Sequence, residues 1–177
     1  PADRIPAKLA VPWHHVMKTL GRPPVLSYAS YALDNWRRLD PAKPIELSNI
    51  VLLQNFFGGL DEEWFVLIHV DIEAKAGPAL AGIAQAFNAA LEDHTAEVAH
   101  ALQTVAVAEE RMYNTLLRMP EGCDPYVYFH RVRPYIHGWK DNPALPYGIV
   151  YEGVEEFHDK PQQFRGETGA QSSIIPA

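Results

Sequence analysis

The chain has 177 residues, of which 47% are hydrophobic, and its formal net charge is −7. This composition fits one globular domain or a large piece of one, and the negative charge disfavours nucleic acid as a partner. Cys123 is the only cysteine, which excludes a disulfide framework and a thiolate metal cluster. The sequence also lacks a run of about 18 apolar residues, the length that would predict a membrane span. We therefore expect a cytoplasmic protein without a membrane partner.

The first 24 residues are rich in proline and predict an extended arm with one helical turn near Trp13–Leu20. Apolar residues then recur every three or four positions over 25–39, which predicts an amphipathic helix that ends before Pro41. Ser48 is a candidate cap for a short helix over 49–56, ended by the glycines at 58 and 59.

The middle of the chain predicts long helices. Asp61 is a candidate cap for a helix over 62–77. Residues 78–119 keep a helical period for longer than the usual globular helix, so we expect one long helix or two with a break near 93–95. Pro125 opens another helix to about Ile136.

The sequence from 137 onward lacks a sustained period and is dominated by glycine, proline, charged and aromatic residues. The pattern as a whole predicts an all-α fold in one domain. We expect an arm over 1–24, a helical core over 25–136 and an irregular pocket-capping region over 137–177.

The richest segment is 128–143, in which aromatic rings, two arginines and two histidines lie close to Pro134 and Gly138. A solvated surface has little use for so many rings, and a core cannot hold so many unpaired charges. The combination suits a pocket for a flat apolar ligand that carries a carboxylate.

Several patches, taken in order, resemble the indoleamine 2,3-dioxygenases. They are residues 23–29, Asn35-Trp36, 64–74, Arg133, Gly138-Trp139-Lys140, Asn142-Pro143, 148–153 and 166–173. The resemblance implies the first part of a large helical domain that encloses haem b. It also implies that the proximal histidine lies outside this chain, on a further polypeptide segment that completes the domain, so no metal ligand is expected here.

The same resemblance assigns site residues. Arg133 would bind the substrate carboxylate through its planar fork, and Tyr128 and Phe129 would pack on the indole. His69 would be the catalytic candidate on the distal face of the haem. Each has a plainer interpretation, namely a surface arginine at a helix end, core aromatics and a hydrogen-bonded core histidine.

The remaining assignments lie at the two ends of the matched region. Tyr28 and Thr168 would contact substrate, and Ala29, Gly169 and Ala170 would contact haem. Two departures from the family pattern stand out: Tyr31, which could narrow the pocket, and Glu167, which adds charge near a haem propionate. Core packing for the tyrosines and a mobile linker for 166–173 are the alternatives.

The resemblance implies cleavage of the indole C2–C3 bond of tryptophan by O2, giving an N-formylkynurenine-type product. A related indole as the substrate stays open. The alternative from another class is a non-catalytic helical module that binds an indole or docks on a partner, because the chain shows no proximal haem ligand.

Overall fold

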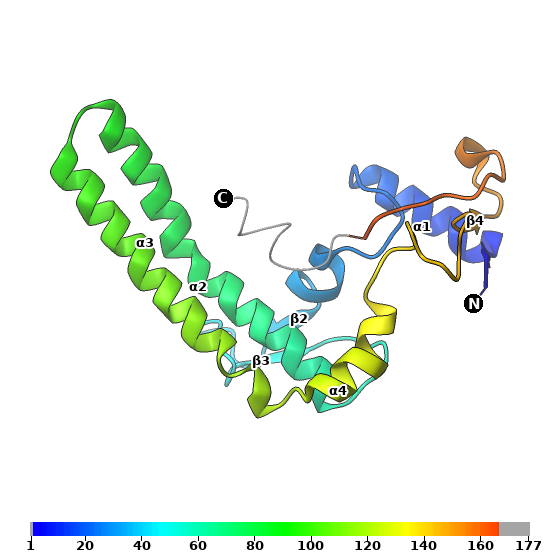
Figure 1. Cartoon of the computed structure of the whole chain (residues 1–177), viewed down its shortest axis with the longest axis horizontal. Coiled ribbons are helices and arrows are strands. Elements are labelled where there is room, and N and C mark those ends of the chain that lie inside the picture. Colours follow the sequence, from blue (N-terminus) through cyan, green and yellow to red (C-terminus); the bar gives the residue numbers. More distant parts are fainter. Residues whose placement is uncertain (1, 167–177) are drawn as a thin grey trace. The chain divides into compact units, whose positions relative to one another are not determined.

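The computed structural model describes residues 2–166, and its architecture is all-α as predicted, with only short strands beside the helices (Figure 1). The described residues form two compact units. Unit 1 comprises residues 2–28 and 136–166, and unit 2 comprises residues 29–135. Within the described part, no helix is both long and apolar enough to cross a membrane.

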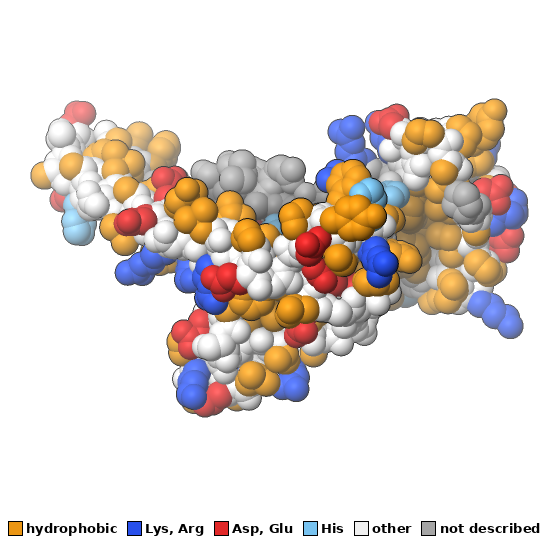
Figure 2. Space-filling model, turned by 60° about the horizontal axis from the view of Figure 1, so that its bottom comes forward, with side chains coloured by type: hydrophobic (Ala, Val, Ile, Leu, Met, Phe, Trp, Pro, Cys, Tyr) orange, Lys and Arg blue, Asp and Glu red, His pale blue; other side chains and the backbone are white. Residues whose placement is uncertain are grey.

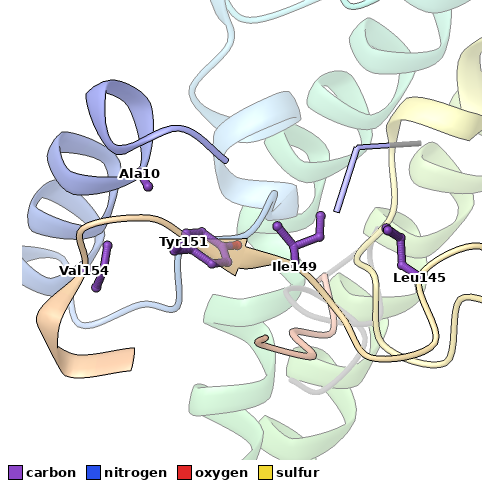
Figure 3. Packing of buried hydrophobic residues seen from close by; sticks show 5 residues of the cluster. All are labelled: Ala10, Leu145, Ile149, Tyr151 and Val154. Carbon is purple, nitrogen blue, oxygen red and sulfur yellow. The ribbon is translucent and has the colours of Figure 1, made fainter. Parts of the chain in front are cut away.

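Unit 1 combines the two ends of the described chain. Strand β1 (Arg4–Ile5) pairs in parallel with β4 (Val150–Tyr151), so that Arg4 lies opposite Val150. Helix α1 (Ala7–Thr19) and the 3-10 turn η5 (Glu155–Phe157) complete the unit. Figure 3 shows the buried cluster that joins these segments, formed by Ala10, Leu145, Ile149, Tyr151 and Val154.

Tyr151 is the centre of this cluster. Its ring contacts those of Trp13, Phe157 and Phe164 at centroid distances of 5.9, 5.5 and 5.8 Å. Its hydroxyl donates to the backbone carbonyl of Pro24 over 2.5 Å. Four of the five aromatic residues of the sequence's irregular region therefore pack in this unit, whereas Tyr147 is exposed.

Helix α1 corrects the prediction of an extended arm. Ala10, Trp13 and Met17 follow one another at helical spacing and turn a face inward, with Ala10 and Met17 buried. Pro12 lies inside the helix, where it removes one backbone donor. Burial of the apolar face against the Tyr151 cluster outweighs this loss, and the proline-rich composition concealed the helical spacing.

The beginning of unit 2 corrects two predicted helices. Residues 25–39 form only the π-helical turn η1 (Ala29–Leu33) followed by strand β2 (Trp36–Arg38), and residues 49–56 contain strand β3 (Ile50–Leu52). β2 and β3 pair antiparallel. Side-chain amides fix this hairpin, because Asn35 bonds both the N–H and the C=O of Gln54 and Asn49 bonds backbone groups of Asp40 and Pro44.

Helices α2 (Leu60–Leu91) and α3 (Thr95–Leu116) form the long antiparallel hairpin of unit 2 (Figure 1). The predicted break near 93–95 is confirmed, and Asp93 takes the left-handed conformation there, with φ 57°. The predicted start at 62 and end at 77 were wrong, since Gly59 precedes the helix and Pro78 lies inside it. Figure 2 shows apolar side chains between charged ones on this hairpin; the exposed ones include Leu80, Ile83, Phe87, Leu91 and Leu102.

The helical segment predicted from Pro125 to Ile136 is confirmed, although it is not a regular α-helix. It consists of α4 (Pro125–Val127), the π-turn η3 (Tyr128–Val132) and the 3-10 turn η4 (Arg133–Tyr135). The carboxylate of Asp124 caps its start by accepting from the backbone N–H groups of Tyr126 and Val127. The 3-10 turn η2 (Met119–Glu121) connects α3 to this segment.

Candidate functional site

Within unit 2, the structure brings two predicted site residues together through a third. The ring of Phe65, on α2, stacks on Tyr128, on η3, with centroids 4.2 Å apart and planes at 27°. Phe65 also contacts the imidazole of His69, one turn along α2, at 4.4 Å. His69 and Tyr128 therefore belong to one aromatic cluster, built by two elements that are distant in sequence.

The imidazole of His69 has a defined orientation. Its Nδ1 lies 2.7 Å from the backbone carbonyl of Phe65, so this nitrogen carries the proton and donates. Burial lowers the pKa of His69 below its usual 6.5, while the carbonyl of Phe65 and the charge of Glu73 act in the opposite direction. The ring is consequently neutral at neutral pH, and its Nε2 has acceptor character.

Two phenols have raised pKa values here, that of Tyr128 in the cluster and that of Tyr31. Burial raises the pKa of Tyr31, on η1, and Tyr128 raises it further. Burial likewise raises the pKa of Tyr128, while the nearby guanidinium of Arg133 lowers it. Both hydroxyls are therefore protonated at neutral pH and can donate a hydrogen bond. Tyr31, which departs from the family pattern, is a buried residue of unit 2 and interacts electrostatically with Tyr128, a predicted substrate-binding residue.

Arg133 and Phe129 form a second, exposed pair. The guanidinium carbon of Arg133 lies 5.8 Å from the centroid of the Phe129 ring. Phe129 is 57% exposed, so this ring is not the core residue that its plainer interpretation predicts. Arg133 begins η4 directly after the π-turn that carries Tyr128, so its positive charge lies five residues after Tyr128 and acts on that phenol.

The other predicted site residues are Tyr28, Ala29 and three residues near the end of the chain. Tyr28 is buried and belongs to unit 1, and Ala29 is the half-buried first residue of η1 in unit 2. Thr168, Gly169 and Ala170 lie outside the described residues, as does Glu167. Among residues 2–166, no group of three or more His, Cys, Asp or Glu is placed to hold a metal ion.

Phe65 is the residue that sequence reasoning missed as a member of the site. The ring of Phe65 contacts both His69 and Tyr128 in the structure. The available signal was its position four residues before His69, which puts both rings on one helix face.

Comparison with known proteins gives a match over the whole chain. The family model described as indoleamine 2,3-dioxygenase matches residues 1–177. The chain is 34% identical to indoleamine 2,3-dioxygenase 2 of Homo sapiens, over 100% of this chain and 43% of that protein. It is 38% identical to indoleamine 2,3-dioxygenase 1 of Rattus norvegicus, over 97% of this chain and 41% of that protein. It is also 31% identical to a protein of Haliotis madaka named myoglobin, over 98% of this chain and 43% of that protein. The chain thus spans about two fifths of the length of these relatives.

Proposed function

Because this chain belongs to the indoleamine 2,3-dioxygenase family, we propose that it supplies the substrate-binding part of a haem-dependent dioxygenase that opens the indole ring of tryptophan. The observation that carries the proposal is the cluster of Phe65, His69 and Tyr128 in the same unit as Arg133. An aromatic wall suits an indole, and an exposed guanidinium suits a carboxylate.

The chemistry of these side chains fits haem on the distal side. A neutral, oriented imidazole beside aromatic rings would set the polarity and the hydrogen bonding on the distal side, which are the properties that tune haem chemistry. Ala29, Gly169 and Ala170 are the residues that we propose to contact the porphyrin, and the proximal histidine would come from outside the 177 residues. When bound, haem b supplies the oxygen chemistry that no side chain can perform.

The residues of this chain bind and orient the substrate. Arg133 would hold the carboxylate by two parallel charge-assisted bonds, while Tyr128 and Phe129 flank the ring. His69 would accept a hydrogen bond at Nε2, the nitrogen opposite the one fixed by Phe65. We also propose that Tyr28 and Thr168 contact the substrate. We also propose a cytoplasmic location, which the single cysteine favours.

The test is an absorption spectrum of the full-length protein, reduced and then exposed to carbon monoxide, followed by assay of tryptophan for N-formylkynurenine. A Soret band that shifts with carbon monoxide, together with product, is expected. A protein without a Soret band would contradict the proposal and favour the non-catalytic indole-binding or partner-docking module.

A second candidate is a haem protein without dioxygenase activity. The similarity to the Haliotis madaka protein favours it, because that protein carries the name myoglobin within the same range of identity. The same experiment separates the two, since this candidate gives the shifting Soret band but no N-formylkynurenine.

A further inference from the structure

The carboxylate of Glu62 is buried at the start of α2 and binds three consecutive backbone amides. It accepts from the N–H groups of Phe56, Phe57 and Gly58 at 2.6, 2.8 and 2.7 Å, and its residue is 2% exposed. Gly58 has a positive φ of 87°, which turns the chain after this loop toward the start of α2, where Glu62 lies. Such charge-assisted bonds fix the loop formed by residues 56–58 on the end of the helix.

The two phenylalanines of this loop contact the segment that carries Arg133. The ring of Phe56 lies parallel to that of Tyr135, at a centroid distance of 6.5 Å and an angle of 4°. The guanidinium carbon of Arg131 lies 5.9 Å from the centroid of Phe57. The loop therefore contacts Arg131 on η3 and Tyr135 on η4, which lie two residues before and two residues after Arg133.

We propose that Glu62 is a positioning residue for substrate binding: through the loop 56–58 it sets the backbone of residues 131–135 and thereby the place of the Arg133 guanidinium. This inference rests on the proposed function, because it assigns Arg133 to the substrate carboxylate. Glu62 binds the loop 56–58 through its carboxylate, so we expect a change at Glu62 to alter substrate affinity more than the chemical step.

The experiment compares Glu62→Gln with Glu63→Gln, the same change one residue further along α2, in the full-length haem protein. The glutamine keeps the size of the side chain, but it replaces one acceptor by an N–H₂ group that faces a backbone N–H. We expect the KM for tryptophan to rise about five- to twentyfold in Glu62→Gln, as for one weakened charge-assisted bond, with kcat nearly unchanged. Glu63→Gln should behave as wild type.

A purely structural role for Glu62 gives a different pattern. Partial unfolding lowers the amount of active protein, and so the apparent kcat, without moving KM; that result overturns the proposal, as does an equal rise of KM in Glu63→Gln. A further check is Phe56→Leu combined with Glu62→Gln. If Glu62 acts through Phe56, the double variant raises KM by less than the product of the two single effects, and independent effects would contradict this route.

If the wild-type protein does not turn over tryptophan, the proposed function fails but the role of Glu62 can still be tested. Hydrogen exchange is the measurement for that case. Glu62→Gln is expected to speed exchange of the backbone amides at 56–58 and also at 128–135. Faster exchange confined to 56–58 overturns the inference, because the loop would then not control the Arg133 segment.

Discussion

The hydroxyl of Thr115 on α3 donates a hydrogen bond of 2.8 Å to the buried carboxylate of Asp71 on α2. Lys75 donates to both groups, at 2.6 Å to Thr115 and 2.5 Å to Asp71. Asp71 is 1% exposed, and both of these partners bind its Oδ2, which offsets part of the cost of burying the charge. This polar contact joins the two helices of the hairpin at one register.

Replacing Thr115 with valine tests this contact. Thr115→Val keeps the shape but removes a donor to Asp71 and an acceptor for Lys75, so we expect the free energy of unfolding to fall by about 1–2 kcal/mol. The control is Thr104→Val, where the hydroxyl donates to the carbonyl of His100 within α3. Denaturant titration of both variants measures the difference, and equal losses would show that Asp71 does not depend on Thr115.

Arg133→Ala tests substrate binding directly. Loss of the guanidinium should raise the KM for tryptophan roughly ten- to hundredfold, because charge-assisted bonds to a carboxylate disappear, while the haem spectrum stays unchanged. Arg133→Lys should also bind weakly, since it keeps the charge but not the fork. Arg111→Ala, an exposed change on α3, is the control. Unchanged kinetics in Arg133→Ala would remove this residue from the site.

The lowered pKa of His69 predicts an effect of pH on stability. Above pH 6.5 the imidazole is neutral in both the folded and the unfolded chain and contributes nothing. As the pH falls below 6.5, the unfolded chain takes up a proton first, so the free energy of unfolding decreases until the lower folded-state pKa is reached.

The variant His69→Gln cannot take up this proton, so its stability should fall less steeply than that of wild type on acidification from pH 6.5. Thermal melts at several pH values measure the two slopes. Parallel curves for wild type and His69→Gln would show that burial does not shift this histidine.

Tyr151→Phe isolates the hydrogen bond in unit 1. Removal of the hydroxyl leaves the buried carbonyl of Pro24 without this donor, and we expect a loss of about 1–3 kcal/mol. Tyr147→Phe, at a residue that is 80% exposed, should change stability little. Calorimetry of the two variants measures their melting temperatures. An unchanged melting temperature in Tyr151→Phe would mean that water replaces the phenol as the donor to Pro24.

The helices that could be predicted from sequence are those whose own residues determine them. The regular apolar spacing of α2 and α3, and the break at Asp93, depend on neighbours a few residues away. Strands β2 and β3 were predicted as helices because their conformation depends on side chains from outside each strand, above all Asn35 and Asn49. Helix α1 needed partners beyond residue 144 to bury Ala10.

In the candidate site, too, some features could be predicted from sequence and others could not. The resemblance pointed to His69, Tyr128 and Arg133, and residue types alone favoured a carboxylate and an aromatic ligand. The contact of Phe65 with both His69 and Tyr128 could not be predicted, because it depends on how α2 packs against a π-turn. The bonds of Glu62 to three backbone amides likewise require the conformation of a glycine loop that has no periodic signal.

The pairing of Arg4 with Val150 has a consequence for the order of folding during synthesis. Residues 2–28 leave the ribosome before their partners at 136–166, and the 107 residues from 29 to 135 take about 5–20 s to add at ordinary translation rates. The α2–α3 hairpin, made of local contacts, can fold in that interval. A folded unit 2 then replaces a long flexible loop, which lowers the entropy lost when β1 and β4 meet. Nascent chains that stall before residue 150 should therefore expose the apolar face of α1 to chaperones, while the hairpin is already protected.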